Sequence, residues 1–204
     1  GVILVSILIF YRQFLVISFD PVLAATLRMR VGAFNYLLLV LLALTLFTVY
    51  FFRNPERVVP DGEKLVVAPA DGKIILVETT SDARFSDDKL LKISIFMNVF
   101  NVHVNRIPYS GLVRKVHHVA GSFLAADSEK AHLNNEYCAV RIVTSDQREL
   151  AMVQIAGLVA RRIICAVQAG DSLKRGQRFG LICFGSRLDI YLPAETEIKV
   201  SVGD

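Results

Sequence analysis

The sequence predicts a mainly β protein: a β-sandwich or barrel-like domain with short helices, preceded by hydrophobic membrane helices. The first observation is the 53% hydrophobic content, whose excess is concentrated in the first quarter of the chain. The second is an abrupt change at Arg53, beyond which short runs rich in Val and Ile follow one another. The third is that Gly, Pro and Asp interrupt these runs at close spacing, as turns do in an all-β domain. We therefore expect membrane-associated segments over 1–52 and one β domain over 53–204.

The first apolar segment runs from Val2 to Phe19 and is interrupted by polar residues around Arg12. Asp20 and Pro21 end it. An arginine near the middle of a spanning helix is costly in free energy. We therefore expect this segment to lie in the membrane interface or to enter the bilayer only partway.

The second apolar segment, 31–52, is a run of about 22 residues without a charge, long enough at 1.5 Å per residue to cross a hydrocarbon core. A secretory signal is the alternative, and the length, the Phe- and Tyr-rich end and the lack of a small-residue cleavage site argue against it. Arg28 and Arg30 precede this segment, and Arg53 and Arg57 follow it, so the positive-inside rule gives no clear orientation. We expect attachment to the cell membrane, with the catalytic domain on the cytoplasmic side.

The remainder of the chain contains the expected strands and a few short helical turns. The strands are expected over 73–77, 90–97, 111–118, 136–144, 149–155, 178–184 and 188–192. Helical turns are expected within 122–130 and 157–164. Residues 170–176 have a G-D-x-[LV]-x-x-G pattern similar to the turn of biotinyl- and lipoyl-type β-sandwiches, and a second copy begins at Gly203. This pattern supports an alternative function, a non-catalytic, membrane-anchored adaptor, and suggests a chain that continues by one more strand.

Charge and cysteine content exclude several function classes. The net charge of +4 is modest and is compatible with attraction to anionic lipid headgroups. The sequence has no basic stripe with interleaved aromatic residues, which nucleic-acid binding needs. Cys138, Cys165 and Cys183 show no C-x-x-C spacing, so neither a disulfide framework nor a zinc site is expected, and a reducing compartment fits best. We expect no metal ion.

Four short motifs occur in a fixed order along the chain. They are FFRNPER at 51–57, PADG at 69–72, FNVHVNRIP at 100–108 and FGSR at 184–187. From about residue 35 onward, this ordered set resembles the short, prokaryotic type of phosphatidylserine decarboxylase, a pyruvoyl-dependent family. The resemblance implies that the chain cuts itself between Gly185 and Ser186 into chains 1–185 and 186–204, which remain associated. It also implies that Ser186 becomes a covalent pyruvoyl cofactor.

The chemistry explains why a Gly-Ser pair suits this self-cleavage. The serine hydroxyl attacks the preceding carbonyl, which turns the amide into an ester; elimination and hydrolysis then leave a pyruvoyl group and ammonia. Gly185 has no Cβ to obstruct this attack and can hold a backbone conformation that strains other residues. The pyruvoyl ketone would form a Schiff base with the amine of phosphatidylserine and act as the electron sink when CO₂ leaves. The products are phosphatidylethanolamine and CO₂.

The resemblance also assigns roles to Asp71 and His103. The matching aspartate orients a catalytic base, and the matching histidine segment forms one wall of the pyruvoyl pocket, so His103 is the candidate acid for the substrate carbon. Longer relatives carry an H-x-x-H pair in this segment, and this chain has Arg106 at the second position. Either His103 serves both self-cleavage and decarboxylation, or His118 supplies the base for self-cleavage.

One further alternative remains, a pyruvoyl decarboxylase that acts on a soluble amino acid. The apolar N-terminal segments argue against it. The expected partners are therefore phosphatidylserine and membrane lipid, together with the second of the two self-cleaved chains. Self-association into a homo-oligomer is compatible with the resemblance, and no nucleic acid is expected.

Overall fold

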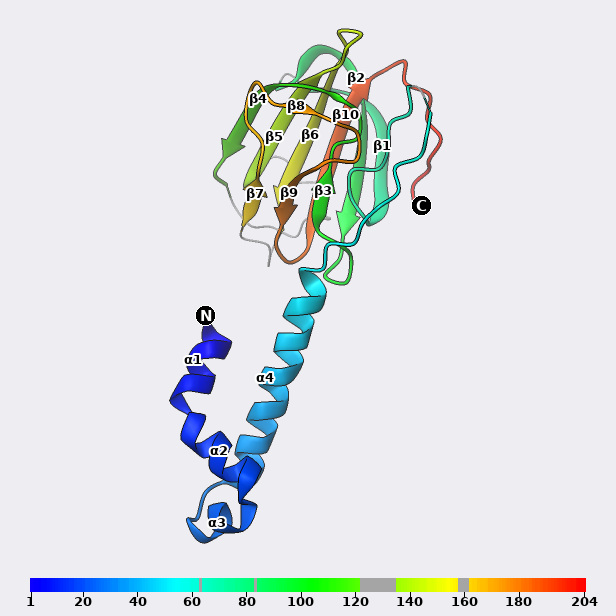
Figure 1. Cartoon of the computed structure of the whole chain (residues 1–204). Coiled ribbons are helices and arrows are strands. Elements are labelled where there is room, and N and C mark those ends of the chain that lie inside the picture. Colours follow the sequence, from blue (N-terminus) through cyan, green and yellow to red (C-terminus); the bar gives the residue numbers. More distant parts are fainter. Residues whose placement is uncertain (63, 83, 122–134, 158–161) are drawn as a thin grey trace. The chain divides into compact units, whose positions relative to one another are not determined.

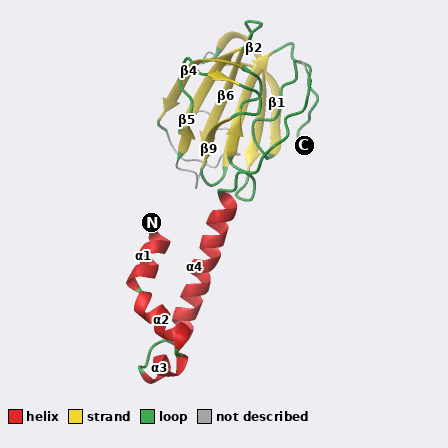
Figure 2. Cartoon of the chain, in the orientation of Figure 1, coloured by secondary structure: helices red, strands yellow, loops and turns green. Residues whose placement is uncertain are grey.

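The computed structural model describes residues 1–62, 64–82, 84–121, 135–157 and 162–204. The chain divides into two compact units, Gly1–Arg53 and Asn54–Asp204. The first unit is helical and the second is built of strands, as Figure 1 and Figure 2 show. The expected mainly β fold with N-terminal apolar helices is therefore confirmed.

The helical unit contains α1 (Val2–Ile9), α2 (Tyr11–Phe19), α3 (Pro21–Thr26) and α4 (Val31–Phe51). A bend of 66° separates α1 from α2, and the side chain of Asp20 caps α3 by accepting a hydrogen bond from the main-chain N–H of Leu23 at 2.9 Å. Edge-to-face contacts join Phe10 and Phe14 to Phe34, so α2 packs against the start of α4. By length and composition alone, α4 can cross a membrane, and the bent pair α1–α2 would count as a second span only if taken together.

Two antiparallel sheets form the β unit. The larger sheet has the strand order β1-β2-β10-β6-β5-β4-β8, and the smaller has the order β3-β9-β7. The strands of the larger sheet are β1 (Lys73–Asp82), β2 (Ser86–Met97), β4 (Gly111–Val119), β5 (Tyr137–Val143), β6 (Glu149–Ala156), β8 (Ser172–Leu173) and β10 (Ser186–Pro193). Those of the smaller sheet are β3 (Val104–Arg106), β7 (Ile163–Cys165) and β9 (Arg178–Ile182).

The main core lies between the two sheets. One cluster of buried residues combines Leu188, Ile190 and Leu192 of β10 with Phe179 and Ile182 of β9. Figure 1 shows the smaller sheet lying against the larger one, in agreement with this shared core. Because side chains alternate along a strand, Ser186 faces the same inner layer as Leu188.

The strand predictions hold for seven of the elements and miss three. Strands β3, β7 and β8 are two or three residues long, too short to show a period in the sequence. The helical turn expected within 122–130 falls outside the described residues. The one expected within 157–164 falls partly outside them, and its last two residues belong to β7, so a helix there is wrong at that end.

Candidate active site

The backbone is strained immediately before Ser186. Phe184 has a φ of 62° and Gly185 a φ of 76°, so both residues adopt the left-handed conformation between β9 and β10. For a bulky side chain such as Phe184 this conformation is rare and costs about 1–3 kcal/mol. A Cβ on Gly185 would come no nearer than 4.0 Å to the Cγ1 atom of Val99, so glycine is needed for its conformation and not for space. The chain is thus held in an unusual turn at the expected cleavage bond.

Ser186 is the first residue of β10 and is completely buried. It pairs with Met97 of β2 on one side and Ala156 of β6 on the other, so its main chain is fixed from both directions. Within the part of the chain that the structure describes, its Oγ atom has no hydrogen-bond partner. Buried hydroxyls are normally paired. The role of this hydroxyl as the nucleophile stays a prediction, since a serine nucleophile also needs a base to take its proton.

His103 reaches this turn from the smaller sheet. It lies one residue before β3, is completely buried, and its Nε2 atom accepts a hydrogen bond from the main-chain N–H of Gly185 at 3.0 Å. Its Nδ1 atom lies 3.0 Å from the main-chain oxygen of Asn101. A carbonyl oxygen can only accept, so Nδ1 carries the proton and Nε2 carries the lone pair that accepts from Gly185. This is the neutral tautomer that a general base at Nε2 requires.

Two buried amides in the same layer were not singled out from the sequence. Asn105 and Gln154 are completely buried, and Gln154 Nε2 donates to Asn105 Oδ1 at 2.8 Å. Asn105 follows His103 by two residues and therefore faces the same side. A glutamine in the middle of the apolar strand Glu149–Ala156 is the signal that could have identified this pair.

Asp71 is found in a different setting from the one expected. Its carboxylate accepts a hydrogen bond from Arg57 at 2.5 Å, and its side chain is 38% exposed. Both residues belong to the motifs that carried the family resemblance. A role for Asp71 in orienting His103 stays a prediction, since the hydrogen bond found for the Nδ1 atom of His103 goes to Asn101.

His118 is not beside the cleavage bond. It lies on β4, three strands from β10 in the sheet order, which corresponds to about 14 Å at 4.7–4.9 Å per strand. Its side chain is 51% exposed, and its Nε2 atom lies 2.8 Å from Glu136 Oε1.

Arg106 occupies the place of the second histidine of longer relatives. It donates to the main-chain oxygens of Pro55 and Gly176, which gives it a structural role.

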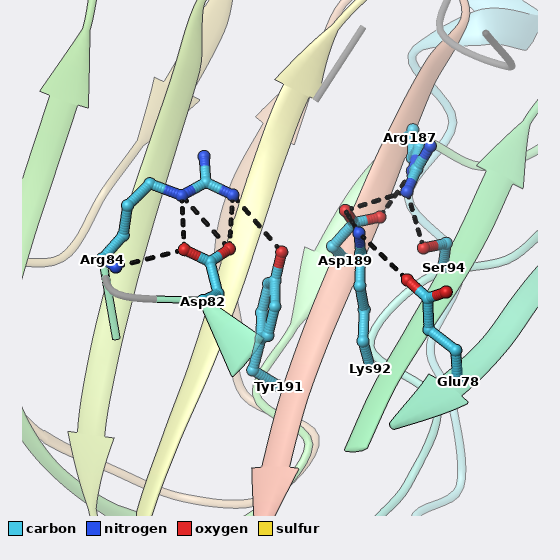
Figure 3. A network of polar contacts seen from close by, with 8 residues as sticks. All are labelled: Glu78, Asp82, Arg84, Lys92, Ser94, Arg187, Asp189 and Tyr191. Atoms are coloured by element: carbon cyan, nitrogen blue, oxygen red, sulfur yellow. Dashed lines mark hydrogen bonds and ion pairs between the residues drawn. The ribbon is translucent and has the colours of Figure 1, made fainter. Parts of the chain in front are cut away.

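The opposite face of β10 carries a buried ionic network (Figure 3). Arg187 donates to both carboxylate oxygens of Asp189, at 2.6 and 3.1 Å, and to the hydroxyl of Ser94 at 2.9 Å. Lys92 Nζ lies 3.9 Å from Asp189 and 3.7 Å from Glu78. Arg187 is 3% exposed and Asp189 0%. The residue that follows Ser186 is therefore fixed by charge-assisted hydrogen bonds.

A second ionic pair lies farther along the same face, between Asp82 at the end of β1 and Arg84 in the turn before β2. Arg84 binds the carboxylate of Asp82 and approaches the hydroxyl of Tyr191 at 3.4 Å. Burial works against the charge on Asp82, but the hydrogen bonds from Arg84 outweigh it and lower the pKa of this carboxyl below its ordinary value. Burial, together with the nearby carboxylates, raises the pKa of Tyr191, so its hydroxyl stays protonated.

Among the described residues, no group of three or more His, Cys, Asp or Glu side chains could hold a metal ion. The chemistry available at the buried layer is that of a hydroxyl, an imidazole and two amides. These groups fit a pyruvoyl precursor, because the hydroxyl of Ser186 lies in the residue after a glycine in the left-handed conformation.

Comparison with known proteins agrees with this arrangement. The family model described as phosphatidylserine decarboxylase matches residues 44–204, which include all four motifs. A second model, described as the ABC 3 transport family, matches only residues 1–50. The phosphatidylserine decarboxylase proenzyme of Syntrophus aciditrophicus is 54% identical over 163 residues, which cover 80% of this chain and 76% of the relative. The proenzymes of Desulfotalea psychrophila and Geobacter metallireducens are 51% and 47% identical, over 81% and 90% of this chain and 77% and 84% of their own lengths.

Proposed function

The chain belongs to the phosphatidylserine decarboxylase family, and from that premise we propose that it converts phosphatidylserine to phosphatidylethanolamine and CO₂ with a pyruvoyl group made from its own Ser186. The observation that carries this proposal is the left-handed turn at Phe184 and Gly185, which presents an unpartnered Ser186 hydroxyl next to a residue bound by His103. The names of the relatives support the substrate and the proenzyme state of the chain.

Self-cleavage is the first of the two reactions. The Ser186 hydroxyl attacks the carbonyl carbon of Gly185, the amide C–N bond breaks, and an ester forms while the nitrogen of Ser186 gains a proton. His103 Nε2 is unprotonated and accepts a hydrogen bond from the N–H of Gly185, so opening of that hydrogen bond would free its lone pair to take the hydroxyl proton. Loss of the Cα proton then expels the Gly185 carboxylate. Hydrolysis of the dehydroalanine that remains releases ammonia and leaves a ketone at position 186.

Decarboxylation is the second reaction. Once formed, the ketone supplies a site for the substrate amine and an electron sink for the pair released with CO₂. The protein residues have three tasks: to hold position 186 between β2 and β6, to exclude water from the buried layer, and to return a proton to the substrate carbon. His103 is the candidate for this last task, because it is buried in the same layer.

The two chains produced by cleavage are expected to remain together. Residues 186–204 contain β10, which pairs with β2 and β6 along its length. The end of this fragment also bonds to β1, since the main-chain N–H of Ile74 donates to Asp204 and that of Gly203 donates to Ile74, each at 2.9 Å. Neither contact depends on the bond between Gly185 and Ser186.

Attachment to the membrane is supported by α4, an apolar helix of 21 residues. The cytoplasmic placement of the β unit stays a prediction, because arginines flank both ends of this helix. The adaptor alternative is not favoured, because the turn at 170–176 that suggested it lies inside the match to the decarboxylase family.

The test of this function is the Ser186→Ala variant. On a denaturing gel, the wild-type protein should run as two pieces, and Ser186→Ala should run as one full-length chain without decarboxylase activity, because no hydroxyl is left to form the ester. Ser172→Ala, at an exposed serine of β8, is the matched control and should cleave normally. Two pieces in Ser186→Ala, or activity that depends on added pyridoxal phosphate, would refute the mechanism.

A further inference from the structure

We propose that the side-chain oxygen of Gln154 binds the amine of the serine headgroup, and that Asn105 orients it. This inference rests on the proposed function and adds a residue that recognises the substrate. It would make Gln154 a binding residue, distinct from the groups that carry out self-cleavage. The argument depends on where Gln154 lies, how its amide is oriented, what the arrangement costs, and which ligand atoms it fits.

Gln154 lies next to Ser186 on the inner face of the large sheet. Ser186 pairs with Ala156, and Gln154 precedes Ala156 by two residues on the same face of β6. A diagonal neighbour of this kind has its Cβ about 7–8 Å away, which a long side chain can span. Asn105, on the facing sheet, contacts Gln154 directly. The amide pair therefore bridges the two sheets beside position 186.

The orientation of both amides follows from their neighbours. Asn105 Nδ2 points at the sulfur of Met97 at 3.7 Å, and a thioether can only accept a hydrogen bond. Asn105 Oδ1 must then face Gln154, where it accepts from Nε2 at 2.8 Å. The remaining oxygen of Gln154, Oε1, has no hydrogen-bond partner among the described residues and is completely buried. The contacts of the two amides thus leave Gln154 Oε1 as an acceptor without a donor among the described residues.

This arrangement is costly for a protein core. Leaving a buried polar group without a partner costs about 1–3 kcal/mol, whereas an apolar side chain of similar size would cost nothing of this kind. The facing strand also makes room for the amide, because a Cβ on Gly180 would lie 2.7 Å from Gln154 Nε2. Gln154 Oε1 lacks a donor at a cost in free energy, although the fold makes room for its amide beside position 186. This combination indicates a ligand that supplies the missing donor.

The ligand atom that fits is an N–H group. An amide oxygen accepts hydrogen bonds, so it attracts an ammonium or amine and is a poor partner for a carboxylate or a phosphate. The serine headgroup carries all three groups, and only its amine has to reach position 186. Binding of that amine by Gln154 would place it against the reacting carbon and leave the carboxylate in the apolar layer, from which CO₂ departs.

The experiment uses Gln154→Leu in the full-length chain, with Met152→Leu as the matched control. Met152 is buried on the same face of β6 and has no polar role. Gln154→Leu should cleave into two chains, because no substrate is needed for cleavage. Its Tm should change little, because removal of the unpaired Oε1 offsets the loss of the hydrogen bond from Nε2 to Asn105. With a short-chain phosphatidylserine, its kcat/KM should fall about 10- to 100-fold, the usual effect of losing a hydrogen bond to a charged group.

A second measurement separates substrate recognition from loss of the ketone. Hydroxylamine reacts with a ketone without needing the headgroup contact, so it should label the small chain of Gln154→Leu to the same extent as that of the wild type. Normal kcat/KM in Gln154→Leu, or a folded Gln154→Leu chain that does not cleave, would overturn this inference. A wild-type protein that remains in one piece would instead refute the proposed function.

Discussion

His103 is held in a single tautomer by main-chain groups. Asn101 accepts from its Nδ1 atom and Gly185 donates to its Nε2 atom, both at 3.0 Å. A carboxylate is the usual partner of a catalytic histidine, and it would stabilise the positive charge that the ring gains during proton transfer. With a carbonyl in that place, the ring is oriented but receives less help in holding a positive charge. The lone pair of Nε2 faces the main chain of the residue before Ser186.

We expect His103→Ala to fold and to remain uncleaved, because the only imidazole next to Gly185 in the described part of the chain would be gone. Asp71→Asn should slow cleavage less, since the carboxylate of Asp71 is bound by Arg57 at the surface. His118→Ala is the matched control and should cleave normally, because His118 lies three strands away. The readout is the fraction of two-chain protein on a denaturing gel over time.

Three outcomes would contradict the role proposed for His103. If His103→Ala is cleaved to two chains but turns over very slowly, His103 serves decarboxylation alone and another base serves cleavage. If His103→Ala is fully cleaved and fully active, it has neither role. An uncleaved His118→Ala would move the base to β4, against the distance given by the strand order.

Strand β10 combines a reactive end with a buried ionic face. Its inner residues, such as Leu188, pack in the core, while Arg187 and Asp189 on the other face form an ion pair that is almost completely buried. A buried pair of this kind is weak evidence for stability, since desolvation can cancel the attraction. Its effect is geometric: it fixes the residue that would become second in the new chain after cleavage.

We expect Asp189→Leu to lower the free energy of unfolding by about 3–5 kcal/mol, because it leaves the charge of Arg187 buried without its carboxylate. The double variant Arg187→Met/Asp189→Leu should recover much of this loss but cleave more slowly than the wild type. Urea unfolding and the gel assay measure the two effects. Arg114→Met, which removes an exposed ion pair with Glu149, is the control and should change stability by no more than about 1 kcal/mol. A double variant as unstable as Asp189→Leu would contradict the desolvation argument.

The sequence predicted the strands whose apolar pattern is long and regular. It missed β3, β7 and β8, which are only two or three residues long. The apolar runs that became β4, β5 and β6 were predicted to within one residue of their ends. Strand β10 was expected to begin at Leu188, and pairing of Ser186 with Met97 of β2 and Ala156 of β6 extends it to Ser186. Ser186 and His103 could be found through the motifs. Gln154 is marked in the sequence only as a glutamine within an apolar strand, and its contact with Asn105, 49 residues away, could not be predicted from that pattern.

At the scale of the whole molecule, the chain combines a helical unit with a β unit that holds every candidate site residue. The strands and both hydrophobic clusters of the β unit lie beyond Asn54. The match covers 76%, 77% and 84% of the lengths of the three relatives. The candidate site residues and the apolar helix that could cross a membrane thus lie in separate units.

We expect a chain that lacks residues 1–52 to fold into the same β unit and to cleave itself. Its activity on long-chain phosphatidylserine in bilayers should fall far more than its activity on a short-chain soluble analogue, because the apolar helices that we propose as its membrane attachment are missing. Circular dichroism and the two activity assays are the measurements. Equal loss on both substrates would mean that the helical unit shapes the active site.

The most direct measurement is mass spectrometry of the small chain from the wild-type protein. If Ser186 is converted as proposed, the fragment 186–204 will be lighter by one ammonia than the same peptide with serine at its N-terminus, and its partner will end in a free carboxyl at Gly185. A fragment that begins with an unmodified serine, a cut at another bond, or an active chain of 22.7 kDa in one piece would contradict the conversion of Ser186.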